Sequence, residues 1–113
     1  MMNIIALENQ EQLEEIANAQ TPAVIFKHNT TCSISRSMKI NFEKEGDVLP
    51  PNTVVYILDL LKYREVSDAI ETKFSVTHES PQVLLIQDGA CSYNASLYDI
   101  SAEEVANAMQ TEN

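Results

Sequence analysis

The stretch AVIFKHNTTCSIS, residues 23–35, contains the two features on which the fold prediction rests. It opens on a short apolar run, Ala23 to Phe26, which follows Pro22 and passes into polar residues. Such a run is typical of a strand that is buried on both faces of a sheet. Beyond Cys32, apolar residues recur every four positions, as one face of a helix requires: Ile34, Met38 and Phe42. The stretch therefore predicts a buried strand that ends near His28 and a helix that begins at or just after Cys32.

The same two periodicities recur on either side of this stretch. Upstream, residues 9 to 19 predict a helix, for which Asn9 and Gln12 provide a weak start signal. Downstream, the β-branched and aromatic run 53–58 predicts a second buried strand, closed by Asp59. Apolar residues spaced for a helix follow from Tyr63 and predict the third helix.

The last third of the chain predicts a hairpin and a final helix. The pair Asp88-Gly89 separates the apolar run 83–86 from the half-alternating run 90–98, which is a strong hairpin signal. A capping box at Ser101 predicts the final helix. Strands joined by a helix should be parallel, and strands joined by a hairpin must be antiparallel. The chain, residues 1–113, is therefore predicted to be one α/β domain with a four-stranded mixed sheet and helices on both faces.

Charge and composition exclude several classes of protein. The chain has 7 Lys and Arg against 17 Asp and Glu, a formal net charge of -10, which disfavours binding to nucleic acid or to an anionic membrane. The sequence has no apolar run long enough for a membrane helix and no signal peptide, so a cytoplasmic location is expected. No metal, flavin or nucleotide site is predicted, and two cysteines are too few for a disulfide framework.

Cys32 is the candidate nucleophile. The positive end of a helix dipole and unpaired N–H groups favour thiolate over thiol at a helix start, and ligands bind at the carboxyl ends of strands in open α/β sheets. Thr31, Ser33 and Ser35 are small hydroxylated neighbours that could donate hydrogen bonds to the sulfur. The alternative is that Cys32 is an inert, small buried side chain, which describes most single cysteines in cytosolic proteins.

The charge around Cys32 is opposite in sign to that of the whole chain. No acidic residue occurs between Glu15 and Glu43, whereas three basic residues do: Lys27, Arg36 and Lys39. We expect these cations to surround the thiol.

The predicted site has one thiol. A dithiol oxidoreductase places its resolving cysteine three residues after the nucleophile, and Ser35 stands there. Cys91 follows the predicted hairpin turn, roughly 20 Å from Cys32 on strand-length arithmetic, which is too far for a disulfide. We expect Cys91 to be structural.

Two histidines are further candidates. His28 lies at the predicted strand end and could touch the site. His78, Ser80 and Pro81 belong to the loop that is expected to face Cys32, where His78 could tune the thiolate or bind a carboxylate of the ligand. The alternative for His78 is a solvated loop side chain.

Several strings along the chain resemble the monothiol bacilliredoxins of the YtxJ type, within the thioredoxin-like superfamily. They are Phe26-Lys27-His28, Thr31-Cys32-Ser33-Ile34-Ser35, Tyr56-Ile57-Leu58-Asp59, Tyr63-Arg64-Glu65-Val66-Ser67 and His78-Glu79-Ser80-Pro81-Gln82-Val83. The resemblance implies a thioredoxin-like fold, a cis Pro81 and Cys32 as the attacking thiol. One departure is Ser33, where the family usually carries proline; its N–H is retained, so the stability of the thiolate is expected to differ.

The resemblance also implies the substrate. The family removes bacillithiol, a conjugate of cysteine, glucosamine and malate, from protein mixed disulfides. The expected partners are therefore bacillithiol and bacillithiolated client proteins. The rival hypothesis is a redox-inactive thioredoxin-like module that binds proteins at the groove beside Pro81.

Overall fold

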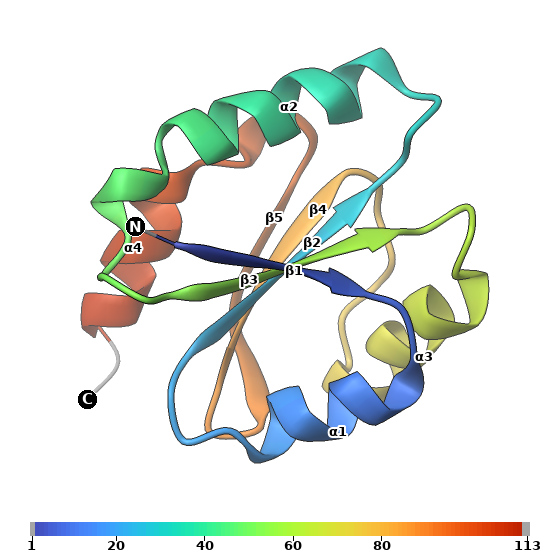
Figure 1. Ribbon diagram of the computed structural model, residues 1–113, viewed down its shortest axis with the longest axis horizontal. Coiled ribbons are helices and arrows are strands. Elements are labelled where there is room, and N and C mark those ends of the chain that lie inside the picture. The colour runs from blue at the N-terminus through green and yellow to red at the C-terminus, as the bar shows by residue number, and fades with distance from the viewer. Residues whose placement is uncertain (1, 112–113) are drawn as a thin grey trace.

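The computed structural model describes residues 2–111, and its centre is a mixed sheet in the order β1-β3-β2-β4-β5 (Figure 1). The five strands are β1 (Asn3–Leu7), β2 (Ala23–His28), β3 (Val54–Asp59), β4 (Gln82–Gln87) and β5 (Ala90–Ser96). The three strands β1, β3 and β2 are parallel, and β4 and β5 each run antiparallel to their neighbours. The predicted α/β class and mixed sheet are confirmed.

The prediction of four strands is wrong, because it omits β1. This strand pairs with β3 along its whole length, from Asn3 opposite Val54 to Leu7 opposite Leu58. It is an edge strand, and only Leu7 of its five residues is buried. The stretch is therefore neither a fully buried run nor an alternating one, so hydrophobic periodicity does not identify it.

The antiparallel part of the sheet agrees with its prediction. Ala23 lies opposite Ile86 and Lys27 opposite Gln82, so β4 begins where β2 ends. Asp88 and Gly89, with φ of 53° and 80°, form the tight turn to β5, since such turns need positive φ at both central residues. Strand β5 ends at Ser96 rather than continuing to residue 98, because Leu97 takes a positive φ of 54°. A short 3-10 helix, η2 (Leu97–Asp99), follows.

Helices cover both faces of the sheet, as predicted (Figure 1). Helices α1 (Gln10–Asn18) and α3 (Arg64–Phe74) lie on one face, and α2 (Ser33–Lys44) and α4 (Ala102–Thr111) on the other. Strand β2 contributes to both cores because its residues alternate between them: Ile25 packs under α1 and α3, and Phe26 packs under α2. The rings of Phe26 and Phe42 lie 5.7 Å apart.

Side-chain caps mark the starts of α1 and α4. Asn9 and Gln12 form a complete capping box at the start of α1. At the start of α4, Ser101 accepts the N–H of Glu104 at 3.3 Å. A 3-10 turn, η1 (Gly46–Val48), follows α2.

No helix within residues 2–111 has the length and apolarity to cross a membrane.

Candidate functional site

Cys32 is the N-cap residue of α2, and its side chain is half-buried. Its N–H donates to the carbonyl of Asn29 at 3.1 Å, and its carbonyl accepts the N–H of Arg36 at 3.1 Å, so the backbone on both sides is held. The first turn of this 12-residue helix has no acidic residue. The thiol therefore lies at the positive end of a helix dipole that no acidic residue of the first turn offsets.

The loop before Cys32 is held by Asn29. The side-chain oxygen of Asn29 accepts the N–H of Thr31 at 3.0 Å and its hydroxyl at 2.8 Å. The hydroxyl proton of Thr31 is thus directed to Asn29, and Thr31 itself is exposed. Ser33 is also exposed at the helix start. Thr31 and Ser33 therefore flank the thiol at the surface, and Thr31 stabilises the loop.

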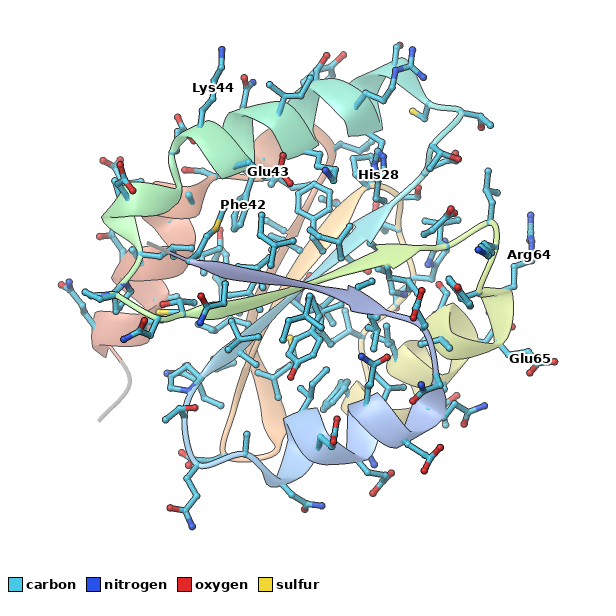
Figure 2. The ribbon with its side chains drawn as sticks, viewed as in Figure 1. His28, Phe42, Glu43, Lys44, Arg64 and Glu65 are labelled. Carbon is cyan, nitrogen blue, oxygen red and sulfur yellow. The ribbon has the colours of Figure 1, made fainter. Side chains whose placement is uncertain are left out.

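Ser35 is fully buried, and its hydroxyl fastens α2 to the end of β2. Its Oγ accepts the N–H of Asn29 at 2.9 Å and lies 2.7 Å from Nδ1 of His28. The position of a resolving cysteine is thus occupied by a hydroxyl with two partners, both at the end of β2. His28 lies under α2, on the side of the sheet that carries Phe42 and Glu43 (Figure 2). Burial, more than the nearby Lys39, lowers the pKa of His28, and Asp59 and Glu43 oppose the shift.

The cations expected around the thiol do not lie together. Arg36 is exposed, and its guanidinium donates to the carbonyl of Thr30 at 3.2 Å, in the loop before Cys32. Lys39 is half-buried and forms an ion pair with Glu43 at 2.9 Å. The expectation for Lys27 is wrong: it has no exposed surface and belongs to the opposite face of the sheet, under α3. Alternation along β2 is the reason, because Lys27 follows Ile25 on one face while Phe26 and His28 share the other.

The segment 75–81 ends beside the carboxyl end of β2. The Ser80–Pro81 peptide bond is cis, Pro81 is buried, and its carbonyl accepts the N–H of Leu97 at 3.0 Å. Because Lys27 is opposite Gln82, Pro81 lies across from the end of β2, which leads to Cys32. The hydroxyl of Ser80 is buried, and no residue of 2–111 forms a hydrogen bond with it. The Ser80 hydroxyl is therefore available to donate or accept a hydrogen bond.

His78 was predicted to act on the thiolate or the ligand, but its hydrogen bonds are to residues of β2 and α3. Its ring Nδ1 lies 3.1 Å from Nζ of Lys27 and 3.5 Å from Oγ of Ser67. Its backbone N–H donates to a carboxylate oxygen of Glu71 at 2.7 Å. Burial, and then the charge of Lys27, lowers the pKa of His78. Local sequence patterns do not predict this contact between Lys27 and His78, because the two residues are 51 positions apart in the chain.

Cys91 lies at the other end of the sheet. It is opposite Ile86, which in turn is opposite Ala23, the first residue of β2. Its thiol donates to the carbonyl of Tyr93 at 3.3 Å, and burial raises its pKa. Cys91 packs against the core beneath α1 and α3 and is half-buried. Position and environment both support the prediction that Cys91 is structural.

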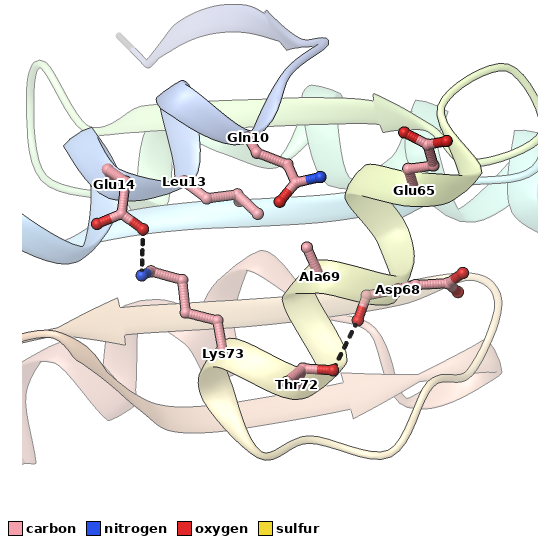
Figure 3. Close-up of a pocket in the computed structure, with 8 residues that line it drawn as sticks. All are labelled: Gln10, Leu13, Glu14, Glu65, Asp68, Ala69, Thr72 and Lys73. Carbon is pink, nitrogen blue, oxygen red and sulfur yellow. Dashed lines mark hydrogen bonds and ion pairs between the residues drawn. The ribbon is translucent and has the colours of Figure 1, made fainter.

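Sequence reasoning did not identify η2 as part of the site. Its first residue, Leu97, bonds to Pro81, and η2 packs against α2. The side chains of Leu97 and Tyr98 are 40% and 73% exposed, so an apolar rim borders the segment that holds Pro81. A groove of about 410 Å³ lies elsewhere, between α1 and α3 (Figure 3). Its acidic lining and its position on the opposite face separate it from Cys32.

Comparison with known proteins agrees with this geometry. A solved thioredoxin-fold protein, described as a candidate oxidoreductase, is 30% identical over 93% of this chain and 92% of its own, with a TM-score of 0.81. The thioredoxin of Malassezia sympodialis (14% identity, 96% and 90% covered, TM-score 0.71) and mitochondrial thioredoxin 3 of Saccharomyces cerevisiae (16%, 96% and 94%, 0.73) share the fold.

The fold is therefore thioredoxin-like, and it supports a thiol-disulfide oxidoreductase. A sequence model of one family, described as monothiol bacilliredoxin BrxC, matches residues 5–105, nearly the whole chain. The matched region contains Cys32, Ser35 and Pro81, the residues on which the site is built. The chain belongs to the monothiol bacilliredoxin family.

Proposed function

We propose that this protein removes bacillithiol from protein mixed disulfides through Cys32. The observation that carries the proposal is the pairing of one thiol at a helix N-terminus with a fully buried serine three residues later. Cys91, the other cysteine, lies at the far end of the sheet. Such a site can form a mixed disulfide but has no internal thiol with which to resolve it.

The proposed reaction is two successive thiol-disulfide exchanges. The Cys32 thiolate attacks the bacillithiol sulfur of the mixed disulfide, and the client leaves as a thiolate that takes a proton from water. Cys32 is then joined to bacillithiol. A second low-molecular-weight thiolate attacks the bacillithiol sulfur, forms a disulfide with it and releases Cys32 as thiolate. Each step breaks one S–S bond and forms another.

The side chains proposed to hold bacillithiol lie around the start of α2 and the end of the segment 75–81. Exposed Arg36 is placed to attract the malate carboxylates, and Lys39 contributes less because Glu43 already pairs with it. The unpartnered hydroxyl of Ser80 is a donor available to the substrate. Thr31 and Ser33 border the thiol, while His78 acts through the segment that carries Pro81.

Client proteins are proposed to dock on the apolar rim of Leu97 and Tyr98, beside Pro81. This rim also suits the rival function, a binding module with an inert Cys32. Alkylation separates the two functions: iodoacetamide should modify Cys32 well before Cys91 at neutral pH, since burial raises the pKa of the Cys91 thiol. Equal, slow modification of both cysteines would favour the binding module.

The decisive experiment uses a purified client that carries bacillithiol on one cysteine. Intact-mass measurement should show the client losing bacillithiol as the protein gains it, and Cys32→Ser should transfer none. Bacillithiolated proteins are expected to occur in the cytoplasm, which is where we propose that this protein acts, without nucleic acid or membrane as a partner. Persistence of the client adduct with the wild-type protein would contradict the proposed function.

A further inference from the structure

Lys27 is a buried cation that the exchange reaction does not use. Lysine is rarely buried without a partner, yet Lys27 has no exposed surface. Its Nζ lies 3.3 Å from the carbonyl of Ser67 on α3 and 3.1 Å from Nδ1 of His78. The ammonium therefore joins β2 to α3 and to the segment 75–81.

The segment 75–81 is held at three consecutive residues. The side-chain amide of Gln82 donates to the carbonyl of Thr77 at 3.1 Å and accepts the N–H of Glu79 at 3.4 Å. Between them, the ring of His78 contacts Lys27, and the backbone N–H of His78 donates to Glu71. Gln82 is the cross-strand partner of Lys27. Two neighbouring buried side chains thus hold the segment that leads to Ser80 and Pro81.

The hydrogen bond specifies the state of the imidazole. A charged Lys27 ammonium can only donate, so its contact with Nδ1 requires that this nitrogen carry no proton, and His78 is then neutral with its proton on Nε2. Protonation of Nδ1 would place an N–H against an ammonium, and two positive charges would face each other at this distance. A charged His78 would lose this hydrogen bond and be repelled by Lys27.

The surrounding charges act on both groups in a consistent way. Asp68 and Glu71 of α3 favour the charged form of Lys27, although burial lowers its pKa. The same two carboxylates, with Glu79, oppose the lowering of the pKa of His78, but burial and Lys27 outweigh them. Two neutral side chains also adjoin the pair: Ser67 Oγ lies 3.5 Å from Nδ1 of His78, and Gln82 of β4 is the cross-strand partner of Lys27.

We propose that Lys27 is a positioning residue: by donating to neutral His78 it fixes the segment 75–81, and so sets Ser80 and Pro81 at the exchange site, until protonation of His78 releases the segment. This regulation of exchange rests on the proposed function. The state of His78 does not, which allows the two to be tested separately.

The first test follows His78 by NMR with ring-labelled histidine. In the wild-type protein, His78 should be the Nε2–H tautomer and should titrate below free histidine. In Lys27→Met, the midpoint should rise and Nδ1–H tautomer should appear. Lys73→Met is the matched control, because it removes a cation that pairs with Glu14 in the groove between α1 and α3 (Figure 3). An unchanged titration in Lys27→Met would overturn the proposal whether or not the protein exchanges bacillithiol.

The second test compares exchange with alkylation across pH. Lys27→Met should slow bacillithiol exchange by about fivefold at neutral pH, the effect of one lost hydrogen bond, and alter iodoacetamide alkylation less than twofold. As the pH drops through the His78 midpoint, the rate of wild-type exchange should also fall by more than the rate of alkylation does. That extra step should be absent in His78→Asn, whose amide oxygen can replace Nδ1 as acceptor but does not titrate.

The outcomes are separable. If Lys27→Met does not fold, His78→Asn and His78→Leu carry the test, with exchange retained in the first and slowed by about fivefold in the second. Equal exchange in these two variants would contradict the positioning role. Absence of exchange in the wild-type protein would contradict the proposed function while leaving the NMR result to decide the state of His78.

Discussion

The Ser35 hydroxyl lies 2.7 Å from Nδ1 of His28 and accepts the N–H of Asn29 at 2.9 Å. Through this one buried oxygen, the first turn of α2 is attached to the last residue of β2. The strand and the helix that carries Cys32 are therefore held together within one helical turn of Cys32. The residue that makes the site monothiol also supports its geometry.

Ser35→Ala should reduce the free energy of unfolding by about 1–3 kcal/mol, because it leaves the part-buried N–H of Asn29 without its acceptor. Urea unfolding measures the loss. Ser37→Ala on the exposed side of the same helix is the matched control and should change stability by less than about 0.5 kcal/mol. A loss at Ser35 no larger than at Ser37 would mean that the hydroxyl does not join helix and strand.

Ser35→Cys should convert the site to a dithiol. The new thiol would stand three residues after Cys32, at the spacing from which a resolving cysteine attacks. After treatment with oxidised bacillithiol, the variant should lose two hydrogens in intact mass, whereas the wild-type protein should keep one bacillithiol. Stable bacillithiol on the variant would show that a thiol buried at position 35 does not reach the adduct.

Cys32→Ser should abolish exchange, whereas Cys91→Ala should leave most of it intact, because the two residues lie at opposite ends of the sheet. Oxidised bacillithiol should therefore add once to the wild-type protein and to Cys91→Ala, and the adduct should accumulate. Peptide mapping locates it. A disulfide between Cys32 and Cys91, or equal losses in the two variants, would contradict the monothiol assignment.

Arg36→Ala should slow reaction with oxidised bacillithiol a few-fold at low salt and less at high salt. An exposed charge contributes on the order of 1 kcal/mol to the attraction of an anion, and salt screens it. Lys39→Ala should have the smaller effect, because Glu43 pairs with Lys39 at 2.9 Å. Stopped-flow rates at two ionic strengths measure both. A larger effect at Lys39 would place the bound carboxylates further along α2.

Stability should fall as pH drops below about 6.5, the ordinary pKa of histidine. Burial lowers the pKa of His28 and of His78 in the folded protein, so the unfolded chain binds these protons more tightly. The free energy of unfolding should therefore decline from this pH until both folded pKa values have been passed. Urea unfolding between about pH 8 and pH 5.5 measures the slope. The double variant His28→Asn, His78→Asn should flatten it, and an unchanged slope would assign it to other groups.

The sequence by itself determined the strand that leads to Cys32, the helix that begins there and the hairpin at Asp88-Gly89. These features depend on residues close in the chain: a continuous apolar run, apolar residues spaced four positions apart and a turn that needs positive φ. The single thiol could be predicted for the same reason, because the spacing of Cys32 and Ser35 is local. The resemblance predicted a monothiol bacilliredoxin, and the family match confirms membership of that family.

Tertiary structure decided where β1 lies and which cations reach the thiol. Strand β1 is defined by its pairing with β3, a partner about 50 residues away in the chain, and its own residues are mostly exposed. The sequence places Lys27 near Cys32, but the alternation of β2 turns it to the opposite face, where His78 and Ser67 become its partners. Contacts between residues distant in the chain, formed by sheet pairing, therefore set the surroundings of a nucleophile that a local pattern could identify.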